Sequence, residues 1–156
     1  AGDAGVPAVL AAAVTEQARF GLGGEIPILI KMAGKPAVAI SGIGTAPKLA
    51  TVEAYRNRQL EPWENPGRAG PIPSAGIKAA VLPGAISGLL LALEQYGTKS
   101  FADVAAPVME YADGFPIGEE FVAFITREQN TLAQWPTSRE FFMPSGSPPG
   151  PPPMSL

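Results

Sequence analysis

The sequence predicts an α+β fold, made of several helices and a small sheet. Apolar residues recur at helical spacing in four segments, and two short β-branched segments are separated by a connection that contains glycine and proline. The composition agrees with a core-forming domain, because 46% of the 156 residues are hydrophobic and 8% are aromatic.

The first predicted elements are a helix and a hairpin. Asp3 suits the N-cap of a helix that runs to about Arg19, and a glycine-rich turn at Phe20–Gly24 follows it. The next two segments, Pro27–Met32 and Ala37–Ser41, are apolar and β-branched. The glycine and proline between them predict that the two strands form a hairpin.

The middle of the chain predicts less regular structure. Thr51 is expected to cap a short helix through Arg58. The stretch Leu60–Gly76 contains four prolines and three glycines, so it is expected to be a loop. The apolar run Ile77–Leu82 is then predicted to be a buried strand.

Three helices are predicted after this strand, and they cover Pro83–Tyr96, Phe101–Asp113 and Gly118–Leu132. The residues expected on inner faces are Ile86, Leu89, Leu90 and Leu93 in the first helix and Phe121, Phe124 and Ile125 in the last. Gly97 is expected to end the first helix, Ser100 to cap the second and Pro107 to kink it. Three strands are too few for a sheet covered on both faces, so further strands are expected outside this chain.

The sequence excludes several kinds of chemistry. It has no cysteine and no histidine, so disulfides, thiol catalysis, Ser-His-Asp arrangements and ordinary zinc sites are ruled out, and no metal or cofactor is expected. The net charge of −3 comes without a block of like charge, which argues against nucleic-acid binding, and the longest apolar stretches are too short to span a bilayer. An N-terminal nucleophile needs Thr, Ser or Cys at position 1, which is Ala1, so no catalytic residue is expected in this chain.

Two local features have simpler explanations than catalysis. The turn Gly21–Gly24 lies between a helix and a strand, whereas a phosphate-binding loop requires a strand followed by a helix. Glu25 directly follows this turn, and for it a solvated or capping role is favoured over a catalytic one. Residues 144–156 carry six prolines and are expected to be a proline-rich loop or loose tail after a 1–143 domain. A polyproline ligand at Pro148–Pro153 is a less favoured alternative.

In order along the chain, a series of motifs resembles the large subunit of the gamma-glutamyltransferase (gamma-glutamyl transpeptidase) family. The Ala79–Leu89 segment is similar to the family's A-V-P-G-x-V-x-G-L motif, and Gly114–Ile117 is similar to its G-F-P-V motif. The block from Gly44 to Pro47 matches the position of the R-E-T-A-P motif. Weaker matches are Ala1–Val6, Phe20–Gly24, Tyr96–Pro107 and Phe142–Pro144.

This resemblance implies the N-terminal part of a partial αββα Ntn-hydrolase sandwich, in a precursor that cleaves itself into two subunits. The family nucleophile is a threonine at the start of the small subunit, and the reaction cleaves or transfers a gamma-glutamyl or related amide through an acyl-enzyme. The implied partners are therefore the rest of the large subunit, the small subunit and a small amide substrate. The resemblance also implies an exported protein, in the periplasm or outside the cell.

One departure from the family bears on the substrate. By resemblance, Ile43, Gly44 and Thr45 hold the substrate-binding positions of the family's Arg-Glu-Thr. Isoleucine cannot replace a bidentate arginine grip on a carboxylate, so a substrate other than a standard gamma-glutamyl amino acid is expected. The alternative hypothesis is a non-catalytic homologue that serves as a structural or binding module. A third hypothesis is a free-standing helical binding domain.

Overall fold

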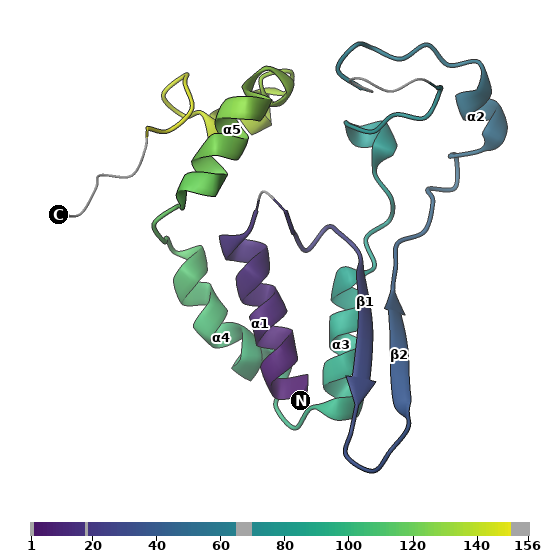
Figure 1. Ribbon diagram of the computed structural model, residues 1–156, viewed down its shortest axis with the longest axis vertical. Helices are drawn as coiled ribbons and strands as arrows, with labels where there is room; N and C mark the ends of the chain where they lie inside the picture. The colour runs from purple at the N-terminus through teal and green to yellow at the C-terminus, as the bar shows by residue number, and fades with distance from the viewer. Residues whose placement is uncertain (1, 18, 65–69, 151–156) are drawn as a thin grey trace. The chain divides into compact units, whose positions relative to one another are not determined.

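The computed structural model describes residues 2–17, 19–64 and 70–150, and within them it is an α+β structure (Figure 1). The elements in chain order are α1 (Gly2–Thr15), β1 (Ile26–Lys31), β2 (Ala37–Gly42), α2 (Val52–Arg56), a short 3-10 helix (Ile77–Ala79), α3 (Ala85–Tyr96), α4 (Phe101–Ala112), α5 (Glu119–Leu132) and α6 (Pro136–Phe142). The chain divides into two compact units. One contains Ala1–Val6 and Leu22–Phe101, and the other contains Pro7–Gly21 and Ala102–Leu156.

The predicted hairpin is confirmed. Strands β1 and β2 pair antiparallel, with Ile26 opposite Gly42 and Lys31 opposite Ala37. In the connection, the Lys35 N–H donates to the Met32 carbonyl at 3.2 Å, and Gly34 adopts a φ of 72°, which glycine accepts without steric cost. The turn therefore sets the register of the two strands.

Helix α3 packs against one face of the hairpin (Figure 1). On that face Ile40 is 6% exposed, and in the helix Leu89 and Leu93 are 2% and 5% exposed. The prediction that Leu90 also faces inward is wrong, because that side chain is 42% exposed. The buried stripe follows Ala85, Leu89 and Leu93 at helical spacing. Leu90 directly follows Leu89, so its side chain points about 100° away from this stripe.

The helix and the hairpin approach so closely that their backbones meet at glycines. A Cβ placed on Gly84 would lie 2.5 Å from the Gly42 carbonyl oxygen and 2.7 Å from that of Ile43. A Cβ on Gly88, one turn further along, would lie 3.0 Å from the Gly42 Cα. These distances are shorter than ordinary van der Waals contacts, so larger residues require the helix to move away from the sheet.

The prediction of a buried strand at Ile77–Leu82 is wrong. Its first three residues form the 3-10 helix, and the side chains of Ile77 and Leu82 are 81% and 55% exposed. Leu82 joins only an isolated antiparallel bridge, in which its N–H donates to the Thr45 carbonyl at 2.8 Å. The 3-10 helix takes up residues 77–79, and the proline after Leu82 lacks the N–H that a longer ladder would need, so three residues remain for pairing.

Helix α1 differs from the prediction at both ends. It ends at Thr15, and Asp3 lies inside its first turn instead of at the N-cap. The Asp3 carboxylate accepts hydrogen bonds from the backbone N–H groups of Thr98 at 2.7 Å and Lys99 at 3.0 Å, and from the Thr98 hydroxyl at 2.9 Å. The Thr98 N–H and then the Lys99 N–H lower the pKa of Asp3. The carboxylate thus ties the start of α1 to the loop that follows α3.

The other helices confirm most of the predicted positions. Thr51 is the N-cap of α2, where its hydroxyl accepts the Ala54 N–H at 3.2 Å, although the helix ends at Arg56. Helix α3 ends at Tyr96 with Gly97 as its C-cap, as expected. Ile125 of α5 is 2% exposed, and α4 continues through its proline.

Helix α6 was not predicted. Its short sequence shows no full apolar repeat, but Pro136 in its first turn is the proline position that helices favour. Phe142 meets Phe121 of α5 edge-on, with 6.1 Å between ring centroids. The following residue, Met143, is 5% exposed. Within the described ranges no helix is long and apolar enough to cross a bilayer.

Substitution of Gly84 by alanine is expected to lower the free energy of unfolding by about 1–3 kcal/mol, because the new methyl group meets two backbone carbonyls. Denaturant unfolding of the purified protein measures the change. Gly21→Ala is the matched control, since a Cβ there meets nothing within 4 Å. Equal stability of the two variants would contradict the close approach of helix and hairpin.

Substitution of Asp3 by asparagine is expected to lower the Tm at pH 7 and to have little effect in acid. The pKa of Asp3 is depressed in the folded state, so its contribution is present above the ordinary value of about 4 and disappears as the pH falls through the depressed value. Thermal unfolding between pH 2 and pH 7 measures this, with Asp113→Asn as an exposed control. A Tm difference that stayed constant down to the lowest pH would count against the linkage.

Candidate functional site

The three residues that sequence analysis assigned to substrate binding, Ile43, Gly44 and Thr45, directly follow β2. The Ile43 side chain is 47% exposed. The Gly44 N–H donates to the Glu25 carboxylate at 2.8 Å, and the Thr45 carbonyl accepts the Leu82 N–H. The segment 43–45 is therefore held from both sides while its first side chain remains accessible.

Glu25 has the capping role that its position after the glycine turn favoured. Its side chain is exposed and precedes β1 directly, and its Oε1 atom receives the Gly44 N–H. A Cβ on Gly44 would lie 3.0 Å from this oxygen and 2.7 Å from a methyl carbon of Val81. Glycine at position 44 thus allows the carboxylate and the 81–82 segment to close on the same backbone.

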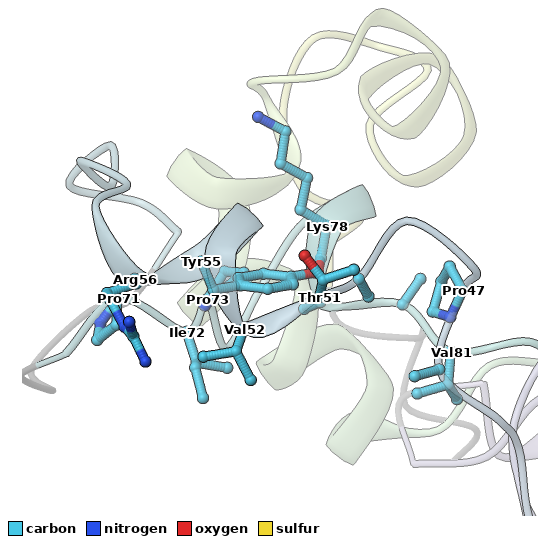
Figure 2. Close-up of a pocket in the computed structure, with 14 residues that line it drawn as sticks. Pro47, Thr51, Val52, Tyr55, Arg56, Pro71, Ile72, Pro73, Lys78 and Val81 are labelled. Atoms are coloured by element: carbon cyan, nitrogen blue, oxygen red, sulfur yellow. The ribbon is translucent and has the colours of Figure 1, made fainter.

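A pocket of about 520 Å³ begins where this segment ends (Figure 2). Tyr55 crosses it, and the Tyr55 hydroxyl donates to the Lys78 carbonyl at 2.8 Å, which joins α2 to the short 3-10 helix. Most of its lining is apolar. The lining residues are Ala46, Pro47, Ala50, Thr51, Val52, Tyr55, Arg56, Pro71, Ile72, Pro73, Lys78, Ala79, Ala80 and Val81.

A buried ion pair organises the loop that supplies one wall of the pocket. The side chains of Arg58 and Glu64 are 14% and 6% exposed and form a salt bridge. The second Glu64 carboxylate oxygen accepts the Glu61 N–H at 2.9 Å, and the Glu64 carbonyl accepts the N–H groups of Ser74 at 2.8 Å and Ala75 at 3.0 Å. The Glu61 N–H and then the Arg58 guanidinium lower the pKa of Glu64.

Sequence analysis did not identify this pair. Arg58 and Glu64 are six residues apart in a segment with no periodic pattern, so neither helix nor strand spacing relates them. Opposite charges that flank a proline-containing stretch are the one signal present. The pair matters to the site because it holds Ser74 and Ala75, which directly follow the wall residue Pro73.

The site offers groups that suit the binding of a small molecule. In the described part of the chain, no three of the His, Cys, Asp and Glu residues lie close enough together to hold an ion. What the site presents is an exposed apolar side chain, one carboxylate and an apolar pocket. Such groups orient a small molecule by shape and charge.

Comparison with known proteins relates the chain to one family. Residues 1–152 match the sequence model of the family described as gamma-glutamyltranspeptidase. The acylase ACY 1 proenzyme of Pseudomonas sp. (strain SE83) is 31% identical over 94% of this chain and 26% of its own length. The glutathione hydrolase-like YwrD proenzyme of Bacillus subtilis (strain 168) is 29% identical over 96% of this chain and 27% of its own length. The chain thus spans about a quarter of the length of these curated relatives.

The fold is similar to solved structures of the same kind. The crystal structure of Helicobacter pylori gamma-glutamyltranspeptidase superposes with a TM-score of 0.79 at 25% identity. The match covers 91% of this chain and 39% of that chain. The α+β arrangement described above is therefore that of part of an Ntn-hydrolase domain.

Replacing Arg58 by methionine is expected to lower the Tm, because Glu64 then keeps its burial without its cationic partner. The loss should be full above the ordinary glutamate pKa of 4.5 and should shrink as the pH falls through the depressed folded-state pKa of Glu64, where the parent protein protonates this carboxylate as well. Thermal unfolding between pH 7 and pH 2 measures both effects. Arg56→Met, at an exposed position on α2, is the control and should unfold like the parent protein.

Proposed function

The chain belongs to the gamma-glutamyltranspeptidase family, and on this premise we propose that it forms the front part of the large subunit of a self-cleaving Ntn hydrolase. The match over residues 1–152 supports this, as do two relatives whose names describe them as proenzymes. The partners of the chain are then the rest of the large subunit and the small subunit of the same precursor.

In this proposal the nucleophile is a threonine exposed at the start of the small subunit by cleavage of the precursor. Its free amine takes the hydroxyl proton, and the hydroxyl oxygen attacks the amide carbonyl of the substrate. The amine of the substrate amide then takes this proton and leaves, and an acyl-enzyme remains. Water or a second amine then attacks the acyl-enzyme and releases the acyl group, so that the threonine is free again. The present chain contributes binding surface to this reaction and no reacting atom.

The substrate is proposed to be an amide other than a standard gamma-glutamyl amino acid. The observation that carries this proposal is Ile43, which by motif resemblance takes the position of the family's carboxylate-binding arginine and is 47% exposed. An apolar side chain cannot form the paired, charge-assisted hydrogen bonds of a guanidinium with a carboxylate. The similarity to a protein named an acylase supports a broader range of acyl groups.

The hairpin suits an αββα sandwich completed by strands from the rest of the protein. Leu29, on the face of the hairpin opposite the Ile40 side, is 75% exposed. Exposed apolar sheet surface of this kind normally packs against further structure. We also propose that the domain ends near residue 143, since Met143 is buried and the described residues 144–150 form neither helix nor strand.

A non-catalytic homologue is the second candidate. The same Ile43 observation favours it, because a homologue without activity no longer needs a substrate-binding arginine. The two candidates differ in the rest of the gene. An enzyme requires a Thr-Thr-His or similar run downstream in the reading frame, and mass spectrometry of the expressed precursor then shows two chains. For a non-catalytic homologue that does not cleave itself, mass spectrometry shows one chain.

The complete protein is expected to hydrolyse gamma-glutamyl-p-nitroanilide poorly, and Ile43→Arg is expected to raise kcat/KM for it roughly 10- to 100-fold, the value of one charge-assisted pair. Release of p-nitroaniline measures the rate. Ile43→Met is the neutral control and should leave the rate unchanged. Parent activity equal to that of an authentic gamma-glutamyltranspeptidase would overturn the substrate proposal.

A further inference from the structure

The carboxylate of Glu25 forms a hydrogen bond with the backbone of the segment 43–45. Its Oε1 atom accepts the Gly44 N–H at 2.8 Å. None of the ion pairs among the described residues includes Glu25, and its other oxygen has no hydrogen-bond partner there. The side chain is also exposed. An exposed carboxylate with one oxygen bound to the Gly44 N–H therefore lies at the residue that follows Ile43.

No ion pair among the residues that the structure describes neutralises this charge. Residues 43–47 carry no charged side chain, and neither do residues 79–87 on the opposite side of the bridge to Thr45. The nearest cations along the chain are Lys48 and Lys78, and the Lys78 side chain extends away from Pro47 and Val81 in Figure 2. The electrostatic character of the segment is accordingly negative.

The anchoring makes this charge a fixed feature of the site. The Gly44 N–H that holds the carboxylate belongs to a backbone that is itself held by the bridge to Leu82. The absence of a Cβ at position 44 leaves the space that the carboxylate oxygen occupies. A charge positioned in advance by the protein discriminates between ligands more strongly than one on a freely rotating side chain.

We propose that Glu25 is a specificity-determining residue, which makes the site favour acyl groups that carry an ammonium and reject acyl groups that carry a carboxylate. The inference rests on the proposed function, in which residues 43–45 line the acyl site. An anionic acyl group meets repulsion from Glu25 and only apolar surface from Ile43. A cationic acyl group gains a partner for the free carboxylate oxygen, and a neutral group is affected by neither interaction.

Four p-nitroanilides separate these effects, because they differ only in the charges on one four-carbon acyl chain. The gamma-glutamyl anilide carries an ammonium and a carboxylate at its end. The 4-aminobutyryl anilide keeps the ammonium alone, the glutaryl anilide keeps the carboxylate alone, and the butyryl anilide has neither. The kcat/KM of the complete, self-cleaved protein is measured with each anilide at low and at high salt.

The parent protein is expected to prefer the 4-aminobutyryl over the butyryl anilide about tenfold, with the glutaryl anilide slowest, and high salt should reduce these ratios. Glu25→Gln keeps an oxygen that can accept the Gly44 N–H but removes the charge. It is expected to bring the 4-aminobutyryl to butyryl ratio to about one and to raise the glutaryl rate about tenfold, an approximate loss of one charge interaction. Glu94→Gln, an exposed glutamate on α3, should change none of the ratios.

The outcomes separate the inference from the function on which it rests. Hydrolysis that favours the glutaryl anilide, or ratios that Glu25→Gln leaves unchanged, would overturn the inference and leave the amidohydrolase intact. An equal fall in all four rates in Glu25→Gln would also overturn it, since Glu25 would then act only on the structure. No hydrolysis of any of the four anilides by the parent protein would reject the proposed function together with the inference.

Discussion

The close backbone approach between Gly42 and the start of α3 is the constraint on which the rest of this unit depends. With no side chain at Gly42, Gly84 or Gly88, the helix lies directly on the hairpin. That approach lets Leu89 and Leu93 become buried in a unit whose described residues form a two-stranded sheet. Burial of each such side chain contributes about 1.5–3 kcal/mol, whereas the glycines themselves cost roughly 0.5–1 kcal/mol each in chain entropy. The balance favours the small residues.

The same contact positions the candidate site. Since Ile26 pairs with Gly42, the residue before β1 and the residue after β2 come to lie at the same end of the hairpin. Glu25 and Ile43 are these two residues, and the carboxylate reaches one residue further to the Gly44 N–H. The negative charge of the segment is therefore a consequence of hairpin register together with the choice of side chain at position 25. Any change in register would separate the charge from the backbone that anchors it.

How much of the fold and of the candidate site could be predicted from the sequence depends on how far apart in the sequence the interacting residues lie. The hairpin, the Thr51 cap and the stop at Gly97 depend on neighbouring residues, and all three were predictable. The apolar run 77–82 has the composition of a buried strand, but its burial depends on a partner strand that the pattern cannot specify. The Arg58–Glu64 pair and the Glu25–Gly44 contact join residues with no periodic relation. For the site, motif resemblance proposed the segment 43–45, and the structure added the contact with the Glu25 carboxylate.

Membership of a family and identity of the substrate rest on different residues in this protein. The motif segments that resemble the family include Gly84 and Gly88, at which the backbones of α3 and the hairpin approach each other. The substrate-facing positions proposed here, 25 and 43, are exposed and contribute little to that packing. Selection for a stable fold therefore leaves them free to change, and under the proposed function a replacement of arginine by isoleucine at position 43 would alter the preferred acyl group without altering the scaffold. Because the nucleophile is proposed to lie on another subunit, changes at positions 25 and 43 do not alter the group that cleaves the amide bond. Under the proposed function, specificity can then diverge through two side chains at one end of a hairpin, so the charges at that end are expected to decide the preferred acyl group.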